Sequence, residues 1–273
     1  MNQEERLDYL IDAFLSESPA YAKASIPVDL QGKRDLLRSL MNVRPPYPID
    51  DEVIEVQDEY LRKRAVEKGI VALSQIPAIA ERGSEHLHAG VISIWQGDIT
   101  RLACDAIVNA ANAQMLGCFT PLHGCIDNFI HTYAGIQLRA ECSRHMDELR
   151  GIHGDEYEQP TSVPMLTEGY NLPAGKVIHI VGPIVYPMLS EEHERQLHDC
   201  YTRCLDLCAG EGLRSIAFCC ISTGVFRFPQ KRAATIAVEA VSTWLSDHPG
   251  KLDRVVFNVF KDEDREHYER ELL

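Results

Sequence analysis

Residues 106–112 read Ala-Ile-Val-Asn-Ala-Ala-Asn, an apolar run that ends in side-chain amides. The run predicts a buried strand at residues 106–108, because near-continuous apolar residues are typical of strands covered on both faces. Four more short apolar runs share this pattern, at residues 91–95, 177–181, 215–220 and 255–259. Between the runs, helical spacing of apolar residues occupies 126–149, 191–209 and 230–245. This alternation predicts an α/β fold with a largely parallel sheet between two layers of helices.

The first 88 residues follow a different pattern. Helical spacing of apolar residues occurs at residues 7–15 and 30–41, and a third helix is expected at 51–66, continuing through 70–80. The proline-rich run at 44–48 separates the second helix from the third. We therefore predict a helical N-terminal extension, residues 1–88, followed by the main domain, residues 89–273. The extension either packs on that domain or provides a docking surface for a partner, and the sequence leaves both readings open.

Composition excludes several classes of protein. The 273 residues hold 27 Lys and Arg against 41 Asp and Glu, a formal net charge of −14. Such a balance disfavours sequence-independent binding of nucleic acid, although backbone N–H groups can still bind a small anionic ligand. The sequence has no run of 18 consecutive apolar residues, so no membrane-spanning helix is predicted. The start of the chain lacks the pattern of a signal peptide, and nine cysteines suit a reducing compartment, so a cytoplasmic location is expected.

Three potential metal ligands follow the strand at residues 106–108. Cys118, His123 and Cys125 lie within eight residues of one another in a glycine-containing loop. Thiolate and imidazole are the ligands that Zn²⁺ prefers, and three protein ligands with an open position are typical of catalytic zinc. Asp127 is the nearby carboxylate, and the fourth ligand is not identified by the sequence. The alternative is two buried cysteines and an exposed histidine without a metal.

Two further loops have sequences suited to ligand binding. Residues 221–226 follow the strand at 215–220, and their small side chains would let backbone N–H groups approach a phosphate, with Phe226 as an apolar wall. A strand-to-helix turn, however, often needs Ser, Thr and Gly in any case. Asp98 follows the strand at 91–95, where it either caps the next turn or accepts a hydrogen bond from the exocyclic amine of a base.

Taken together, these loops resemble the macrodomain family. The resemblance covers about residues 90 to 271 and rests on four motifs in the family's order: Gly97-Asp98-Ile99-Thr100, residues 106–112, His179-Ile180-Val181-Gly182-Pro183 and Ser222-Thr223-Gly224-Val225-Phe226. Residues 170–174, Tyr-Asn-Leu-Pro-Ala, look like the MacroD-type branch. The resemblance implies a three-layer α/β/α domain, with a mostly parallel mixed sheet, that binds ADP-ribose in a cleft above the strand ends.

The resemblance also implies roles for individual residues. Asp98 would contact the adenine amino group with Ile99 beside it, and Asn112 would face the distal ribose. The loop residues Ser222, Thr223, Gly224, Val225 and Phe226 would wrap the diphosphate, with Phe226 against the distal ribose. The implied substrate-binding set also includes Cys118, Thr120 and Asp127. As a hypothesis on the mechanism, Asn112 and Asp127 are the catalytic residues, the first orienting the ribose and the second either accepting a proton or holding a contact to a metal ligand.

One departure from the MacroD pattern matters for activity. His123 stands where relatives carry a catalytic Asp, and residues 118–122 replace their glycine-rich stretch. The Cys118, His123 and Cys125 arrangement resembles the zinc-containing subgroup of macrodomains. That subgroup implies a zinc-dependent hydrolase that removes mono-ADP-ribose from proteins, here expected at Asp or Glu side chains. It also implies an N-terminal helical extension and association with a class M sirtuin and a lipoyl-carrying, glycine-cleavage-H-like protein.

Two other functions fit the same residues. A non-catalytic reader would bind ADP-ribose and use zinc only to brace the loop. A deacetylase would act on the small metabolite O-acetyl-ADP-ribose. Release of free ADP-ribose from a modified protein, with and without a chelator, separates the hydrolase from the reader, and rates on protein and metabolite separate the hydrolase from the deacetylase.

Overall fold

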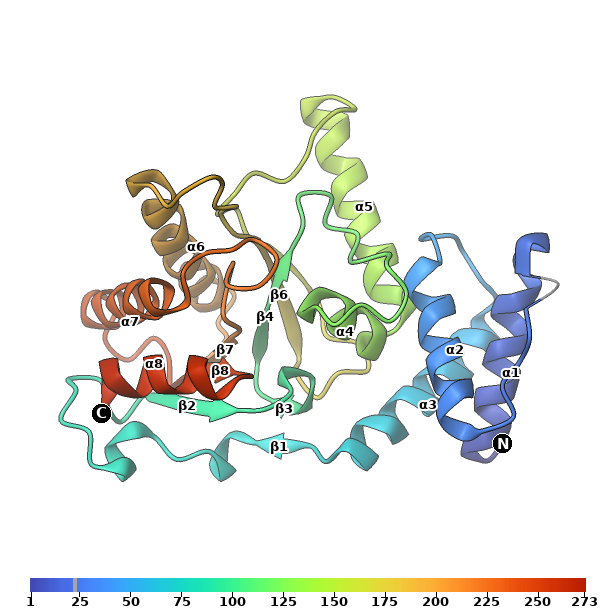
Figure 1. The fold of residues 1–273 in the computed structure, drawn as a ribbon, viewed down its shortest axis with the longest axis horizontal. Coiled ribbons are helices and arrows are strands. Elements are labelled where there is room, and N and C mark those ends of the chain that lie inside the picture. The colour runs from blue at the N-terminus through green and yellow to red at the C-terminus, as the bar shows by residue number, and fades with distance from the viewer. Residues whose placement is uncertain (22–23) are drawn as a thin grey trace.

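A mixed sheet lies at the centre of the computed structural model, which describes residues 1–21 and 24–273 (Figure 1). Its strand order is β2-β8-β7-β4-β6-β5, and every neighbouring pair is parallel except β5 with β6. The strands are β2 (Ile92–Gln96), β4 (Ala106–Ala111), β5 (Met165–Glu168), β6 (Lys176–Val181), β7 (Ser215–Phe218) and β8 (Arg254–Val259). The predicted mostly parallel sheet is confirmed, and the antiparallel β5 is an addition to it.

Helices flank this sheet. In Figure 1, α6 and α7 lie to one side of β4 and β6, and α4 and α5 lie to the other. The helices of this part are α4 (Ile126–Ala134), α5 (Ile136–His153), α6 (Glu191–Gly210), α7 (Gln230–Asp247) and α8 (Asp262–Leu272). The prediction of one continuous helix at 126–149 is wrong. Gly135, with a φ of 103°, separates α4 from α5, because a backbone in that region cannot continue a right-handed helix.

Three N-terminal helices precede the sheet, as predicted, and they pack around a core of their own. They are α1 (Gln3–Ser16), α2 (Leu30–Val43) and α3 (Asp51–Lys68), and Figure 1 shows them at one end of the molecule beyond α4. Leu10, Leu37 and Tyr60 are buried where the three meet, and Ile136 of α5 joins the same cluster. This arrangement places the extension against the face of the domain that carries α4 and α5.

The third helix does not continue through residues 70–80 as the spacing predicts. Gly69, with a φ of 84°, ends α3, and β1 (Val71–Ala72) then pairs in parallel with β3 (Leu102–Ala103). Short 3-10 turns follow at Leu73–Gln75 and Ile79–Arg82. Ile76 and Ile79 pack into the core of the sheet rather than into that of the helices. The boundary at residue 88 stays a prediction.

The sheet topology brings three loops to one edge. Strands β4, β7 and β8 are parallel neighbours, so their carboxyl ends meet at the same side of the sheet. Ligands in open α/β sheets bind at that side. The segments that leave these strands, residues 112–125, 219–229 and 260–261, are therefore the ones to examine for a site. None of the helices in residues 1–21 and 24–273 has the length and apolar character needed to cross a bilayer.

Candidate functional site

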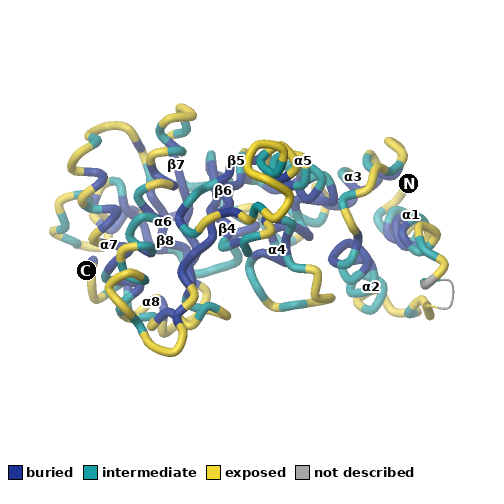
Figure 2. The backbone as a smooth tube through the Cα atoms, turned by 90° about the horizontal axis from the view of Figure 1, so that it is seen from above, coloured by how far each residue is buried: buried dark blue, intermediate teal, exposed yellow. Residues whose placement is uncertain are grey.

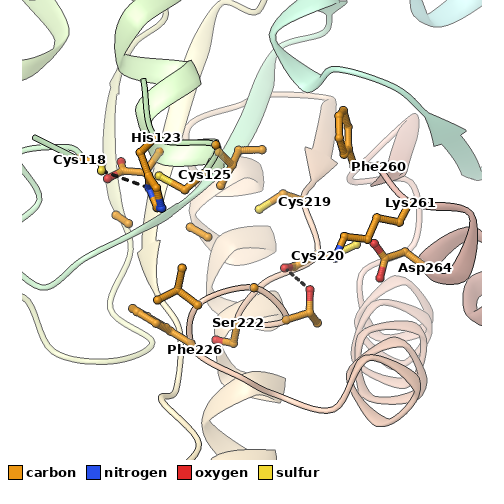
Figure 3. A pocket seen from close by; sticks show the side chains of 18 of the residues that line it. Cys118, His123, Cys125, Cys219, Cys220, Ser222, Phe226, Phe260, Lys261 and Asp264 are labelled. Atoms are coloured by element: carbon orange, nitrogen blue, oxygen red, sulfur yellow. Dashed lines mark hydrogen bonds between the residues drawn. The ribbon is translucent and has the colours of Figure 1, made fainter. Parts of the chain in front are cut away.

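A cleft of about 500 Å³ opens at the carboxyl edge of the sheet. Its walls come from the end of β4 and the loop after it, the start of α4, the loop after β7, and the segment from β8 into α8. In Figure 3, Cys118, His123 and Cys125 lie together on one wall, and Phe260, Lys261 and Asp264 lie at the far side. Figure 2 shows the exposed loops around this buried sheet edge. The cleft therefore joins residues from three separate parts of the chain, 110–127, 219–230 and 258–264.

Most of the predicted site residues line this cleft. They are Asn112, Cys118, His123, Cys125 and Asp127 on one side, and Ser222, Thr223, Gly224, Val225 and Phe226 on the other. Thr120, Asp98 and Ile99 are outside the lining: Thr120 is exposed and Ile99 is buried. The roles predicted for all these residues stay predictions, since position alone does not test them.

Asp98 has partners within the chain. Its carboxylate accepts hydrogen bonds from the backbone N–H of Thr100, at 3.0 Å, and from the Thr100 hydroxyl. The ammonium of Lys68, at the end of α3, lies 2.7 Å from the other carboxylate oxygen. Burial opposes ionisation of Asp98, but the Lys68 charge and these hydrogen bonds outweigh it and lower the pKa. The capping role weighed for Asp98 is present, and the N-terminal helices contribute a charge beside it.

Cys118, His123 and Cys125 have the geometry of a metal site. Their ligand atoms all lie within 4.8 Å of one another, and Cys118 Sγ is 3.5 Å from His123 Nδ1. Tetrahedral zinc, with bonds of about 2.3 Å to sulfur and 2.0 Å to nitrogen, separates neighbouring ligand atoms by about 3.5–3.8 Å. All three side chains are half-buried and face the cleft, so an ion bound here would be in contact with a ligand in the cleft.

Cys125 is a protonated thiol in the metal-free protein. Burial is the main cause that raises the pKa of Cys125 to about 12, and neighbouring Cys118 and Asp127 raise it further against the opposing effect of the Asn128 N–H. A divalent ion reverses this balance, because it displaces the thiol proton. Cys125 is moreover the N-cap of α4, where the helix dipole favours negative charge. The donor set therefore fits zinc.

Gly117 begins the loop that carries these ligands. Its φ of 79° lies in the left-handed region, and a Cβ built on it would lie 2.7 Å from the ring of His131. Both features require glycine, since a side chain would strain the backbone and displace the ring. The close packing of Gly117 on His131 fixes where the loop leaves the core. We call residues 117–125 the ligand loop.

Asp127 lies at the floor of the cleft in a buried hydrogen-bond network. Asn109 Nδ2 donates to Asp127 Oδ1 at 2.8 Å and to His179 Nδ1 at 3.0 Å. Because His179 Nδ1 accepts, its ring proton is on Nε2, which donates to Thr167 Oγ1 at 2.9 Å. Burial raises the pKa of Asp127 to about 6, although Asn109 and Arg139 partly lower it. The network thus orients a carboxylate whose pKa is close to neutrality.

Two buried histidines near Asp127, one inside this network and one outside it, predict a pH-dependent stability. Burial lowers the pKa of His179 to about 3 and that of His131 well below its usual value, so both are neutral in the folded protein. The unfolded chain binds a proton at each below about pH 6.5. Stability should therefore fall as pH decreases from about 6.5 to 5, by up to about 1.4 kcal/mol per pH unit for each histidine. Asp127 opposes this below about pH 6, because its raised pKa lets the folded protein bind a proton there, and it offsets at most the share of one histidine.

Urea unfolding of the metal-free protein at several pH values measures this slope. His131 is the better position for a variant, because both its ring nitrogens lack hydrogen-bond partners within residues 1–21 and 24–273. In His131→Leu the slope of the unfolding free energy against pH should be smaller by up to about 1.4 kcal/mol per pH unit, the value for one proton. An unchanged slope would show that His131 is not kept neutral by the fold.

The loop after β7 forms a tight turn with one unpartnered hydroxyl. Ser222 has a φ of 64°, its carbonyl accepts from the Phe228 N–H at 3.0 Å, and the Thr223 hydroxyl donates to the Cys220 carbonyl at 3.1 Å. Ser222 Oγ is buried and has no partner in the part of the chain that the structure describes. A buried hydroxyl without a partner at the edge of a cleft is suited to a polar ligand.

The far wall of the cleft consists of residues that no sequence motif predicts as part of a site. Gln230, Asn258, Phe260, Lys261 and Asp264 line it, as do Cys219 and Cys220, which the strand pattern places only in the core. The acidic run at 262–266 reads as a solvated helix start, and this interpretation is wrong for Asp264, which is 7% exposed. Their position in the sequence could have indicated a role in the site, because residues 260 and 261 follow a parallel strand, as the segment with the ligand loop does.

Comparison with known proteins supports the same fold. The Macro domain family model matches residues 108–237. A "Protein-ADP-ribose hydrolase" of Treponema medium is 44% identical over 270 residues, which is 99% of either chain. The chain belongs to the macrodomain family. A protein of the same name from Staphylococcus aureus strain MRSA252 is 40% identical over 268 residues, covering 98% of this macrodomain chain and 95% of the relative.

A solved structure adds a ligand to the comparison. The Trypanosoma brucei macrodomain, solved in complex with ADP-ribose, is 30% identical and has a TM-score of 0.63. The match covers 85% of this macrodomain chain and 94% of the other. The predicted family and the predicted α/β architecture are thereby confirmed.

Proposed function

We propose that this macrodomain is a zinc-dependent hydrolase that removes mono-ADP-ribose from modified proteins, with the linkage at Asp or Glu side chains. The observation that carries the proposal is the convergence of the Cys118, His123 and Cys125 cluster with the Ser222 loop on a single cleft. Full-length relatives at 44% and 40% identity bear the name of a protein-ADP-ribose hydrolase, which supports the activity.

The residues of the cleft suit the parts of ADP-ribose. Backbone N–H groups of the turn at residues 222–226 and the free Ser222 hydroxyl would bind the diphosphate. Phe260, which is 75% exposed, offers a flat apolar surface for the adenine, while Asp98, outside the lining of the cleft, would accept from the adenine amino group. Asn112 and Asp127 then lie beside Cys118, His123 and Cys125, at the end of the cleft where the distal ribose would be.

The chemistry divides between two side chains of the protein. Asn112 would orient the ribose through its amide, which already accepts from the Gln114 N–H and donates to the Gly117 carbonyl. Asp127, held by Asn109, would take a proton from the attacking water. A zinc ion bound by Cys118, His123 and Cys125 would supply Lewis acidity at this end of the cleft.

The partners and location extend the proposal. The substrate is a mono-ADP-ribosylated protein, and a lipoyl-carrying, glycine-cleavage-H-like protein modified by a class M sirtuin is the target that the resemblance suggests. We propose a cytoplasmic location on the chemistry of the nine cysteines, which are all free thiols.

The Ser222 turn provides a prediction for ligand binding. A Cβ at Gly182 would lie 2.1 Å from Ser222 Oγ and 2.8 Å from Ile221 Cγ2, so Gly182→Ala must displace the Ser222 hydroxyl that is proposed to bind the diphosphate. The dissociation constant for ADP-ribose, measured by calorimetry, should rise by at least about tenfold. Gly210→Ala is the matched control, because no heavy atom lies within 4 Å of its Cβ position. Equal affinities in the two variants would contradict the role of the turn.

The activity is tested by product analysis with two substrates. Purified protein is incubated with a protein mono-ADP-ribosylated on Asp or Glu and, separately, with O-acetyl-ADP-ribose, and free ADP-ribose is quantified. The proposal expects rapid release from the protein. Tight binding of ADP-ribose without release would indicate a reader, and release from the metabolite alone would indicate a deacetylase.

A further inference from the structure

Helix α2 of the N-terminal extension contacts the ligand loop directly. Its apolar residues Leu37, Leu40 and Met41 are buried in the core shared with α1 and α3. Arg38 and Asn42, four residues apart and so on one face of the helix, instead bond to residues of the loop and of α4. The packing of the helices does not require these two polar side chains, which leaves their orientation to be explained.

Arg38 makes three hydrogen bonds beside the candidate metal ligands Cys118, His123 and Cys125. Nη2 donates to the carbonyl of His123 at 2.7 Å and to Asn128 Oδ1 at 2.7 Å, and Nε donates to the same oxygen at 3.1 Å. The guanidinium also lies 4.1 Å from the ring centroid of Phe129 in α4. Hydrogen bonds from a charged donor are the stronger class, and the planar guanidinium fixes their direction. Arg38 thus restrains the backbone of one candidate ligand directly.

Asn128 extends this restraint to the two cysteines. It is fully buried, and its side-chain nitrogen donates to the carbonyls of Thr120, at 3.0 Å, and of Cys118, at 3.5 Å. Its backbone N–H lies 3.4 Å from Cys125 Sγ. The oxygen of the same amide is the one that Arg38 bonds. Arg38 and Asn128 together therefore contact all three candidate ligand residues.

Asn42 anchors the middle of the loop. Its Oδ1 accepts from the Leu122 N–H at 3.1 Å, and its Nδ2 donates to Thr132 Oγ1 of α4 at 3.0 Å. Leu122 has a φ of 55°, which is unfavourable for a side chain with a Cβ and needs such support. Both ends of the Asn42 amide are used, so α2 sets the position of the loop relative to α4.

We propose that the N-terminal helices serve to preorganise the ligand loop for zinc, and that Arg38 is the positioning residue through which they do so. The inference rests on the metal site in the proposed function. A loop held by Arg38 and Asn128 loses little conformational freedom when the ion binds, so the affinity for zinc is higher than the three ligands alone would give. Arg38 contacts neither substrate nor metal and acts only through the backbone of His123 and through Asn128.

The test compares Arg38→Ala with a matched change on the same helix. Lys33 also lies on α2, but its ammonium pairs with Asp8 of α1, 2.6 Å away, so Lys33→Ala removes an equal charge without touching the loop. The dissociation constant for zinc is measured by competition with a chromogenic chelator. Urea unfolding of both variants in the metal-free state separates positioning from general stability, and Arg38→Lys, which keeps the charge but not the fork of donors, is measured alongside.

The inference expects zinc to bind Arg38→Ala at least about 10-fold more weakly than the parent, as for other partners that orient metal ligands. Arg38→Lys should lie between the two, and Lys33→Ala should match the parent. In the metal-free state Arg38→Ala should unfold at a lower urea concentration than the parent, because Asn128 loses its partner, but it should stay folded under the conditions of the zinc titration. If zinc is limiting, Arg38→Ala should have a higher KM for the mono-ADP-ribosylated protein than the parent. Saturating zinc should bring this KM back towards the parent value. Parental zinc affinity in folded Arg38→Ala or Arg38→Lys would overturn the inference alone. A parent that binds no zinc would overturn the metal in the proposed function and this inference with it.

Discussion

Cys118→Ala should lose bound zinc and lower kcat/KM for release of ADP-ribose from a modified protein by more than about 100-fold. Even the groups that only orient metal ligands contribute 10- to 100-fold, and this change removes a ligand itself. Cys118 Sγ lies 3.5 Å from His123 Nδ1, so its loss leaves one thiol and one imidazole on a solvent-accessible loop. Metal analysis of the purified variant and initial rates on the same substrate measure the two effects.

Cys208→Ala is the control for this change. Cys208 is buried in α6 and does not line the cleft. The variant therefore loses one of the nine cysteine thiols and leaves Cys118, His123 and Cys125 in place. It should retain the zinc content and the turnover of the parent. A Cys118→Ala protein with parental turnover and no zinc would show that the ion takes no part in the reaction.

Asp127→Asn should lower kcat by about 100- to 1,000-fold, the contribution of a well-placed general base. The substitution preserves shape, and Asn109 Nδ2 still has an oxygen to which it can donate. Zinc content and the dissociation constant for ADP-ribose should therefore stay at parental values. Single-turnover rates on a mono-ADP-ribosylated protein, together with calorimetry, distinguish a loss of chemistry from a loss of binding.

Asp147→Asn provides the comparison for loss of one carboxylate. Asp147 lies on α5, and its side chain is two-thirds exposed, pairs with Arg150 at 3.0 Å and accepts from the Ser143 hydroxyl at 3.5 Å. This variant should have the parental kcat. If Asp127→Asn keeps the parental kcat as well, Asp127 is not the proton acceptor and the proposed division of roles is wrong.

Local pattern was enough to predict five of the six strands of the main sheet, all but β5, and the cluster of Cys118, His123 and Cys125. The apolar runs at β4, β6, β7 and β8 are near-continuous because both faces of the sheet are covered, and that signal needs no knowledge of distant contacts. Cys118, His123 and Cys125 lie in one short loop, so their proximity follows from sequence separation. The clustering of the Ser222 turn with that loop followed from the rule that parallel strands end at a common edge.

Features set by distant contacts were missed. The bond from Arg38 to His123 joins residues 85 positions apart, and no local pattern marks it. Asp264 looks like the solvated acid of a helix start until β8 and the Cys220 segment are placed against it. Residues 70–80 have helical spacing, but pairing of β1 with β3 and burial of Ile76 in the sheet core override it. Tertiary packing decided each of these cases over local propensity.

The most direct test of the account titrates metal against turnover. The protein is stripped of metal with a chelator, zinc is added back in steps, and the rate of ADP-ribose release from a mono-ADP-ribosylated protein is followed together with bound zinc. The account predicts that the rate is lost with the metal and rises linearly to a plateau at equimolar zinc, as the Cys118, His123 and Cys125 site fills. Release at the full rate from metal-free protein would contradict it.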